Sequence, residues 1–328
     1  MKLPYFYKKS SQIEALVIRI EIARAVLNNI PIVAHTEENL RRISLLKSSL
    51  FSARIEGNRL TFDQIKNETN TIRTSNREKK EVFNIISALR FAKSFKGNIT
   101  SHALVEIHKR VMKGLGSFGE FRKEPSAIFN QAGFAVYMTP PPSQIQKLLE
   151  RLLEFMNNPS VDPLPIQAAI AHFAFEKIHP FLDGNGRVGR ILSMMHLERL
   201  GYHFRWIVSF EKYFDEKKAD YYYGLSINGT NITEFVAFFL EALATSAENV
   251  IGELKNKKED KIEDTLLPRR AEILAIIRDH KIMSFDQIRR RFLKINPRTL
   301  HYDLECLLRE NLIRKLGRTR GAHYAIPS

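Results

Sequence analysis

The stretch HPFLDGNGRVGR, from His179 to Arg190, joins two apolar segments whose three- and four-residue periodicity predicts helices over 164–178 and 187–200. Its three glycines free the backbone where the first helix must end and the second begin. A main chain without side chains can approach a ligand closely, and the amides at the start of a helix bind phosphate. The loop is therefore a candidate phosphate-binding site.

Charged side chains surround this loop in a pattern suited to polyphosphate chemistry. Arg187 and Arg190 stand three residues apart on the first helical turn, so they share a face and can both contact phosphate oxygens. Asp183 offers a hard carboxylate oxygen for Mg²⁺, and His179 can remove a proton from an attacking hydroxyl. A helix stop with surface arginines is the plainer interpretation, which so many such residues within twelve positions disfavour. A P-loop is excluded because no GxxxxGK[ST] occurs.

The first 250 residues predict an all-α fold. Further helical periodicity covers about 12–28, 37–54, 78–95, 100–113, 209–225 and 231–250. Another amphipathic helix follows Pro140-Pro141-Pro142, with Ser143 placed to cap it. One exception is 126–139, where apolar residues alternate after the turn-like Asn130-Gln131-Ala132-Gly133 and predict a short β-hairpin.

Composition indicates a soluble protein, since 44% of the residues are hydrophobic and 27% charged. We find no apolar run long enough to cross a bilayer and no secretion signal, so we expect a cytoplasmic location and no membrane partner. Cys306 stands alone and is expected to be buried, as are Trp206 and the group Phe235, Phe238 and Phe239. His172 has no HExxH or cysteine partner and is expected to be packed.

The excess positive charge gathers at the end of the chain. Residues 266–328 hold 14 Lys or Arg against 6 Asp or Glu, after the polar stretch 252–265, which suggests a solvated helix end or a linker and which we take as the domain boundary. The segments RRAEILAIIRDH, SFDQIRRRFL and NPRTLHYDLECLLREN predict three helices, and LIRKLGRTRGAHYAI predicts two strands. This order is typical of a winged helix-turn-helix domain, and a cap at Asn296 before Pro297 suits the third helix.

A basic domain of this kind can bind DNA or protein, and the sequence favours neither. For DNA, the candidate contacts are Arg298, Thr299, His301, Tyr302, Arg318 and Arg320. We therefore expect four parts: an N-terminal helical region (1–95), a core (96–251), the linker (252–265) and the tail domain (266–328).

The loop matches in full the HPFx[DE]GNGRxxR signature, so the chain resembles the Fic proteins from about Leu3 to Ala247. The resemblance includes GEFRK at 119–123 and YYYGL at 221–225. It implies a helical Fic fold with a β-hairpin flap. It also implies Mg²⁺-dependent transfer of AMP from ATP to a Ser, Thr or Tyr hydroxyl of a target protein, whose main chain pairs with the flap at 126–139. A few relatives transfer other phosphate-containing groups.

The resemblance also assigns roles to individual residues. It makes His179 the base and Asp183 the metal ligand, with Tyr221 and Tyr222 near the adenine, although Tyr223 leaves that register open by one residue. The implied ATP-binding positions of the loop are Gly184, Asn185 and Gly186 as the anion hole, followed by Arg187, Val188, Gly189 and Arg190.

An upstream sequence resembles an inhibitory motif of the same family. Ser52-Ala53-Arg54-Ile55-Glu56-Gly57 matches [ST]xxxE[GN] within a predicted helix at about 40–57. By resemblance, Ser52, Glu56 and Gly57 belong to an inhibitor whose glutamate reaches Arg190 and leaves ATP in an unproductive pose. In some relatives this glutamate helps to remove AMP, and dimers mask or expose the helix, so hydrolysis and a homodimer stay open. An ordinary glutamate before a helix stop is the plain alternative, and a DNA-binding regulator with a nucleotide-sensing core is the rival function.

Overall fold

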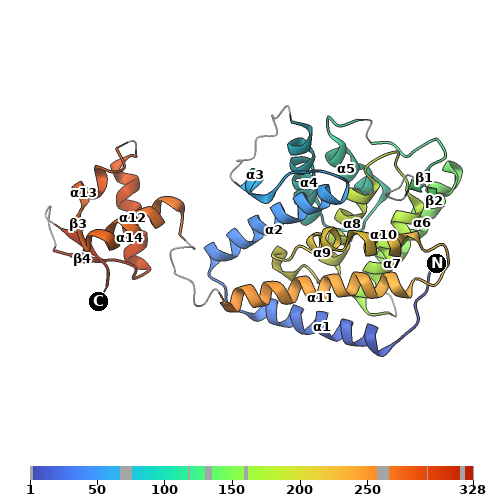
Figure 1. Cartoon of the computed structure of the whole chain (residues 1–328), viewed down its shortest axis with the longest axis horizontal. Helices are drawn as coiled ribbons and strands as arrows, with labels where there is room; N and C mark the ends of the chain where they lie inside the picture. Colours follow the sequence, from blue (N-terminus) through green and yellow to red (C-terminus); the bar gives the residue numbers. More distant parts are fainter. Residues whose placement is uncertain are drawn as a thin grey trace. The chain divides into compact units, whose positions relative to one another are not determined.

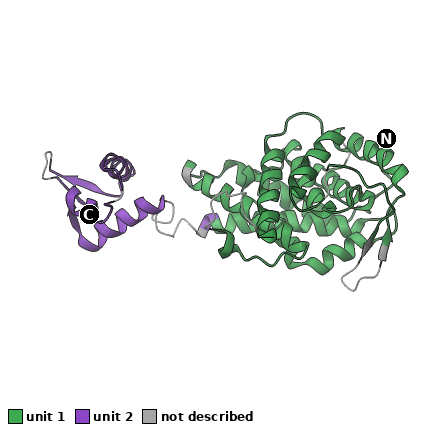
Figure 2. Cartoon of the chain, turned by 90° about the horizontal axis from the view of Figure 1, so that it is seen from above, with its two compact units in different colours: residues 1–253 green, residues 254–328 purple. Residues whose placement is uncertain are grey.

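The computed structural model describes residues 3–66, 76–116, 119–129, 135–158, 162–256, 266–293, 295–317 and 322–327. It forms two compact units, residues 1–253 and 254–328, which Figure 2 shows in green and purple. The first unit is almost wholly helical, and the second combines helices with a small sheet (Figure 1). The expected all-α fold class is confirmed.

The helices of the first unit agree with the periodicity of the sequence. They are α1 (Ser11–Asn29), α2 (Ala34–Ile55), α3 (Phe62–Lys66), α4 (Arg77–Ser94), α5 (Ser101–Met112), α6 (Pro142–Asn157), α7 (Leu164–Ile178), α8 (Asn185–Arg199), the 3-10 helix η1 (Phe204–Trp206), α9 (Glu211–Glu216), α10 (Lys218–Ser226) and α11 (Thr233–Asn256). The single helix expected over 209–225 is wrong, because Lys217 takes a non-helical conformation (φ −111°, ψ 38°) that separates α9 from α10.

The start of α6 also differs from the expectation. The helix begins at Pro142, with Pro141 before it and no side-chain cap, so Ser143 is a helical residue and not the cap. The cause is proline itself, whose fixed φ suits the first turn of a helix and whose missing N–H would have no partner there.

Two adjacent helices, α7 and α8, form the centre of the first unit. Every residue of α7 from Pro165 to Ile178 is buried, as its almost uniformly apolar sequence requires. The two helices pack against each other, while α4 and α5 cover α8 and α6 covers α7. Gly189 lets α8 approach closely, because a Cβ atom there would overlap the Glu176 carboxylate and lie 2.9 Å from Phe175 Cδ1. The loop 179–184 connects this pair.

One helix meets the length and composition of a membrane span, contrary to the expectation of no such apolar run. Among the described residues, the stretch 233–255 of α11 passes that test, and half of the apolar stretch is buried inside the first unit. Phe235 and Phe239 are buried, as expected of core aromatics, whereas Phe238 is only half-buried and that part of the expectation is wrong. In Figure 1, α11 runs along the lower side of the first unit above α1.

The predicted hairpin is present as β1 (Ala127–Phe129) and β2 (Ala135–Met138), which pair antiparallel with Ile128 opposite Tyr137. Its base is closed by Thr139, whose backbone N–H (3.1 Å) and hydroxyl (2.7 Å) both donate to the Ser126 carbonyl. The predicted turn at 130–133 lies outside the described residues.

The second unit has a core of its own. It contains α12 (Pro268–His280), β3 (Ile282–Ser284), α13 (Phe285–Arg289), α14 (Pro297–Arg309), β4 (Arg314–Leu316) and β5 (His323–Ala325). The strands form an antiparallel sheet in the order β3-β5-β4. The core holds Ile273, Leu274, Ile276, Ile277, Met283, Ile288, Phe292, Leu300, Leu304, Leu307, Ile313 and Tyr324.

The elements of this unit follow the sequence closely. The Asn296 side chain caps α14 by accepting from the backbone N–H of Arg298 (2.9 Å), with Pro297 in the first turn, as predicted. Strand β3 was not predicted, and α13 is shorter than its predicted segment. Cys306 is half-buried and not fully buried.

A pair of glycine-to-alanine changes tests the close approach of α7 and α8. We expect Gly189→Ala to destabilise the protein by about 1–3 kcal/mol, because the added methyl overlaps Glu176 and Phe175. The control Gly252→Ala lies in a helix where a Cβ atom meets nothing within 4 Å, so it should stabilise by about 0.5–1 kcal/mol. Calorimetric unfolding midpoints of both variants measure this, and a midpoint for Gly189→Ala at or above that of the parent contradicts it.

Candidate functional site

His179 ends α7 in an unusual backbone conformation. Its φ of 48° and ψ of 60° lie in the left-handed region, which costs a non-glycine residue about 1 kcal/mol or more. Its backbone N–H donates to the Phe175 carbonyl (3.0 Å), and its own carbonyl accepts from Arg122 Nε (2.8 Å). These two hydrogen bonds fix the backbone of His179 and so the point from which its imidazole extends.

The His179 ring is held as a neutral base. Its Nδ1 lies 3.3 Å from the Glu176 carbonyl, which can only accept, so the ring proton sits on Nδ1 and Nε2 keeps its lone pair. Burial lowers the pKa of His179 below its usual range. The ring is therefore unprotonated at neutral pH and ready to accept a proton through Nε2.

Arg122, a buried side chain, joins this histidine to the hairpin. Besides the His179 carbonyl, its guanidinium donates to the carbonyls of Glu124 (2.9 Å) and Pro140 (2.6 Å), which flank the hairpin on its two sides. In the sequence, Arg122 stands out only as part of GEFRK, and that pattern assigns it no role. No local pattern could have found it, since its partners lie up to 57 residues away.

Asn185 shapes the loop from within. Its side-chain oxygen accepts from the Phe181 N–H (2.8 Å) and its amide donates to the Phe181 carbonyl (2.7 Å). Gly184 then opens α8 with φ 81°, where a Cβ atom would lie 2.9 Å from Met112 Sδ. Because the Asn185 side chain is used inside the loop, the groups available to an anion are the backbone amides of the first turn of α8.

His108, from α5, supports the same loop and was missed by the sequence. Its Nδ1 accepts from the Gly119 N–H (3.1 Å), so its Nε2 carries the proton and donates to the Asp183 carbonyl (3.0 Å). Its ring stacks on Phe181 with 3.8 Å between centroids. The contact holds the main chain at Asp183 in place.

Asp183 is the accessible carboxylate of the loop, with 61% of its side chain exposed. One of its oxygens accepts from the Gly184 N–H (2.5 Å) and Arg187 Nη2 (3.0 Å). Among the described residues no group of three or more His, Cys, Asp or Glu could hold a metal. A single carboxylate still fits Mg²⁺ that takes its other ligands from phosphate and water.

Arg187 and Arg190, predicted to bind phosphate, both contact protein carboxylates in this structure. Arg187 Nη1 donates to Glu81 Oε1 (2.5 Å), a partner on α4 that sequence analysis did not consider. Arg190 is 1% exposed and donates from Nη2 to Glu56 Oε1 (2.7 Å). The same guanidinium donates to Ser52 through Nε to Oγ (3.0 Å) and Nη2 to the carbonyl (2.9 Å).

Glu56 and Ser52 therefore come to the loop from the end of α2. Glu56 is the C-cap of α2 and Gly57 follows at φ 102°. The Glu56 carboxylate lies against Gly186, where a Cβ atom would overlap it and lie 3.0 Å from Arg190 Nη1. Ser52 and Glu56 of the predicted inhibitory motif therefore contact the part of the site that is predicted to bind phosphate.

The charges around Arg190 are balanced by one carboxylate. Burial would raise the pKa of Glu56, but Arg190 and Arg187 outweigh it and hold that pKa below its usual range. Burial raises the pKa of Glu176 to about 8, so this nearby carboxyl is neutral at pH 7. Glu56 thus supplies the negative charge, and Arg190 Nη1 has no hydrogen-bond partner within the described structure.

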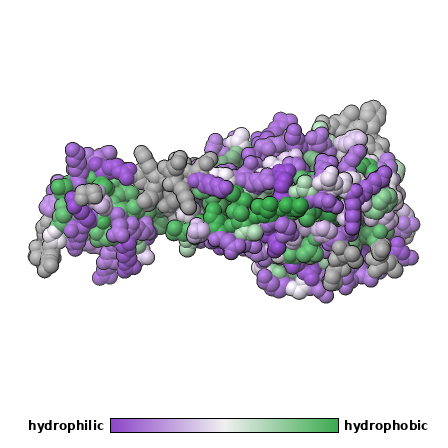
Figure 3. Space-filling view, turned by 90° about the horizontal axis from the view of Figure 1, so that it is seen from below, coloured by the Kyte–Doolittle hydropathy of each residue, from purple (hydrophilic) through white to green (hydrophobic). Residues whose placement is uncertain are grey.

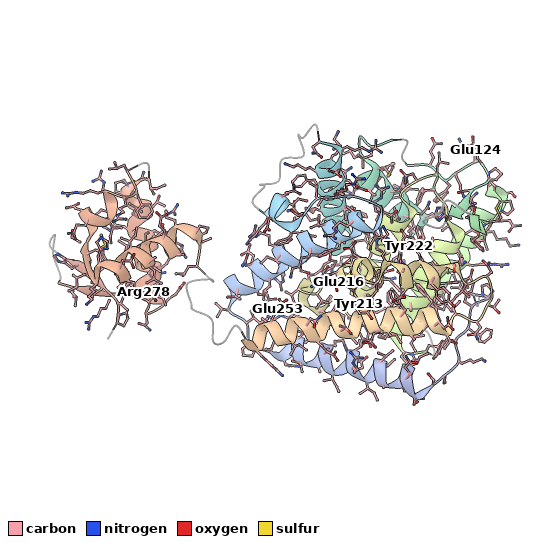
Figure 4. The ribbon with its side chains drawn as sticks, in the orientation of Figure 1. Glu124, Tyr213, Glu216, Tyr222, Glu253 and Arg278 are labelled. Atoms are coloured by element: carbon pink, nitrogen blue, oxygen red, sulfur yellow. The ribbon has the colours of Figure 1, made fainter. Side chains whose placement is uncertain are left out.

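The three adjacent tyrosines have different environments, and two of them, Tyr221 and Tyr222, lie near Arg190. Tyr221 is 1% exposed, and its hydroxyl pairs with His172 Nε2 (2.9 Å). Tyr223 is 67% exposed. Tyr222, labelled in Figure 4, donates from its hydroxyl to the Ile55 carbonyl (3.3 Å) beside Glu56. Tyr222 is therefore the tyrosine that the structure brings next to the α2 end of the site.

His172 is packed, as predicted. Its Nδ1 lies 2.8 Å from Ser193 Oγ, and burial lowers its pKa to about 3. Val188 is fully buried and Gly189 faces Glu176, so both can reach a nucleotide only through their backbone. Trp206 is half-buried and not in the core as expected.

Known proteins resemble this chain around the loop. Residues 98–197 match the model of the Fic/DOC family. The chain is 31% identical over 202 residues to a protein adenylyltransferase Fic from Drosophila erecta, covering 58% of this chain and 38% of that protein. It is 32% identical over 152 residues to a probable protein adenylyltransferase of Aquifex aeolicus, covering 44% of this chain and 45% of that one. The chain spans less than half the length of these curated relatives.

The fold is also found among solved structures. A Fic family protein from Desulfovibrio desulfuricans has a TM-score of 0.71 to this chain at 23% identity, covering 100% of this chain and 99% of that one. The family match over 98–197 includes α7, α8 and the loop between them. The chain therefore contains a Fic domain.

Proposed function

We propose that this protein transfers AMP from ATP to a Ser, Thr or Tyr hydroxyl of a target protein. The observation that carries the proposal is the neutral His179, with Nε2 free, beside a helix start bearing Arg187 and Arg190. The names of the similar proteins from Drosophila erecta and Aquifex aeolicus support the same activity.

Each residue of the loop has a step in this reaction. His179 Nε2 takes the proton of the target hydroxyl, whose oxygen attacks the α-phosphorus of ATP. The bond from that phosphorus to the bridging oxygen breaks, and pyrophosphate leaves. The backbone amides of residues 185–187 receive the charge on the α-phosphate, and Arg187 and Arg190 bind the phosphates beyond it. Asp183 would hold Mg²⁺, which neutralises phosphate charge when bound.

The hairpin would position the target. A two-stranded sheet leaves unpaired N–H and C=O groups on its outer edges, and an extended segment can add to such an edge as a further strand. Recognition of this kind uses the main chain of the target, so it leaves the choice of target side chain weak.

The Glu56–Arg190 contact supports self-inhibition. A carboxylate 2.7 Å from Arg190 Nη2 occupies the guanidinium that the terminal phosphate of ATP would need. While this contact holds, the terminal phosphate cannot take its place, so the resting protein should be nearly silent. Two alternatives stay open: removal of AMP by a water molecule oriented on Glu56, and transfer of a group other than AMP. Intact-mass measurement of a modified target distinguishes them from AMP transfer.

We expect Glu56→Gly to raise protein labelling by ATP marked at the α-phosphate about ten- to hundredfold, since it removes a charged hydrogen bond to Arg190. The matched control is Glu310→Gly, because Glu310 is the C-cap of α14 with nearly the same backbone conformation. Adding His179→Ala to Glu56→Gly should lower labelling about 10²–10⁴-fold. Equal labelling by Glu56→Gly and the parent would refute self-inhibition.

The pH profile of the Glu56→Gly variant tests the role of His179. A base works only when unprotonated, and burial lowers the pKa of His179. Labelling should therefore rise with pH through a midpoint below the ordinary value of about 6.5 and stay level through pH 7. An acid limb centred above 6.5 would count against His179 as the base.

The second candidate function is regulation through DNA bound by the tail. Arg298 and Tyr302 on α14 are exposed, whereas His301 stacks on Phe285 at 3.8 Å and Arg269 and Arg270 both pair with Asp303. Arg318 and Arg320, predicted on the wing, lie outside the described residues. The cytoplasmic location and the homodimer stay predictions.

Salt dependence tests this second function. If the tail binds DNA through its basic residues, the full chain should bind a duplex more weakly as salt rises, by about one counterion per phosphate contact. Arg298→Ala should reduce both the affinity and the salt slope, with Arg278→Ala as the control on another helix. Absence of any duplex binding at low salt would reject the regulator.

A further inference from the structure

A cavity of about 220 Å³ lies on the other flank of α2, between α2, α4 and the segment around Trp206. Its lining, as far as the structure describes it, holds four basic side chains, Arg41, Arg42, Arg90 and Lys93, and no acidic one. The floor is apolar. Nothing in the proposed transfer reaction uses this cavity.

The basic side chains around the cavity are crowded. Burial, and then the nearby Arg41, lower the pKa of Lys93. The carboxylates nearest to them are already engaged: Glu37 pairs with both Arg41 and Arg205, and Glu198 accepts from Trp206 Nε1 (2.8 Å). Among the basic side chains, Arg41 is the like charge that repels Lys93, and an anion between the two would reduce this repulsion.

The apolar part of the cavity offers a flat surface. The Trp206 ring is half-buried, and Lys93 Nζ lies 5.5 Å from its centroid. Buried Leu89 and Met194 complete the floor. An aromatic face beneath a cation suits a ligand that carries charge at one end of a flat ring.

We propose that this cavity binds a small organic anion: a carboxylate, sulfonate or phosphate on a flat aromatic body. The charged group would lie among Arg41, Arg42 and Lys93, and the ring against Trp206. Figure 3, which views the molecule from below, shows an apolar band along the first unit bordered by polar residues. The cavity combines four basic side chains with a floor made of Leu89, Met194 and the half-buried Trp206 ring.

Binding at this cavity would act on α2. Ser44, Leu45 and Ser48 line the cavity from α2, and one and two helical turns beyond Ser48 the same helix presents Ser52 and Glu56 to Arg190. The cavity exists in the conformation in which Glu56 holds Arg190. Because Ser48 and Ser52 belong to the same helix, a ligand that bridges α2 to α4 and Trp206 would resist any displacement of α2 away from Arg190. This regulatory step rests on the proposed function, whereas the binding site does not.

The chain itself provides the reporter for binding. Trp206 is its one tryptophan, so tryptophan emission from the full chain reports on this cavity alone. Titration with naphthalenesulfonate should change the emission saturably. Naphthol, which has the ring without the charge, and inorganic sulfate, which has the charge without the ring, should each bind about tenfold more weakly or worse. Equal affinity for naphthol would overturn the anion site.

Single substitutions locate the site. Lys93→Met and Arg42→Met each keep an apolar stem and remove a charge, so each should weaken naphthalenesulfonate binding about tenfold. Lys96→Met is the matched control, since Lys96 follows the end of the same helix and does not line the cavity. Both side chains are exposed at helix surfaces, so folding should survive. Unchanged affinity in Lys93→Met and Arg42→Met would overturn the proposal.

Labelling assays test the coupling separately. Saturating naphthalenesulfonate should lower the basal labelling by the parent about fivefold or more and leave Glu56→Gly unaffected. Unchanged or increased labelling by the parent would overturn the coupling. If no variant labels protein at all, the proposed transferase fails, while the emission titration still decides the binding site.

Discussion

The buried charge of Arg190 constrains everything around the loop. A guanidinium that is 1% exposed needs a negative partner within reach, and the neutral Glu176 does not provide one. Glu56 does, and for that α2 must end at the start of α8, where the hydroxyl and the carbonyl of Ser52, one turn earlier, accept from the same guanidinium. The placement of α2 is thus tied to a single cation on α8.

This arrangement gives the resting protein a defined electrostatic state. In the proposed reaction, exchange of Glu56 for the terminal phosphate of ATP would replace one anion by another at the same guanidinium, so the buried charge would never be left unpaired. The competition is therefore between two ligands of Arg190, and its balance depends on how firmly α2 is held. Contacts elsewhere along α2, including those near Ser48, enter that balance.

The sequence was sufficient for features that depend on local pattern. The helix pair α7–α8, the glycine loop and the hairpin follow from periodicity and turn residues, and the match of Ser52–Gly57 to a short motif located Glu56. It was insufficient where partners are distant: Arg122, His108 and Glu81 bind atoms 57, 75 and 106 residues away. Nor could YYY at 221–223 reveal which ring is buried, because that depends on how α10 rotates against α7. The break between α9 and α10 at Lys217 was not predicted either, because no helix-breaking residue marks it in the sequence.

The Arg122 guanidinium is a hydrogen-bonding partner shared by the hairpin and His179. Its bonds to the carbonyls of Glu124, Pro140 and His179 fix the spacing between the hairpin and the imidazole. If a target strand pairs with that hairpin as proposed, one residue along the strand would lie nearest to Nε2, and its two neighbours would point to the opposite face. Such an enzyme would select the modified hydroxyl by its position along the target strand more strictly than by the type of side chain that carries it.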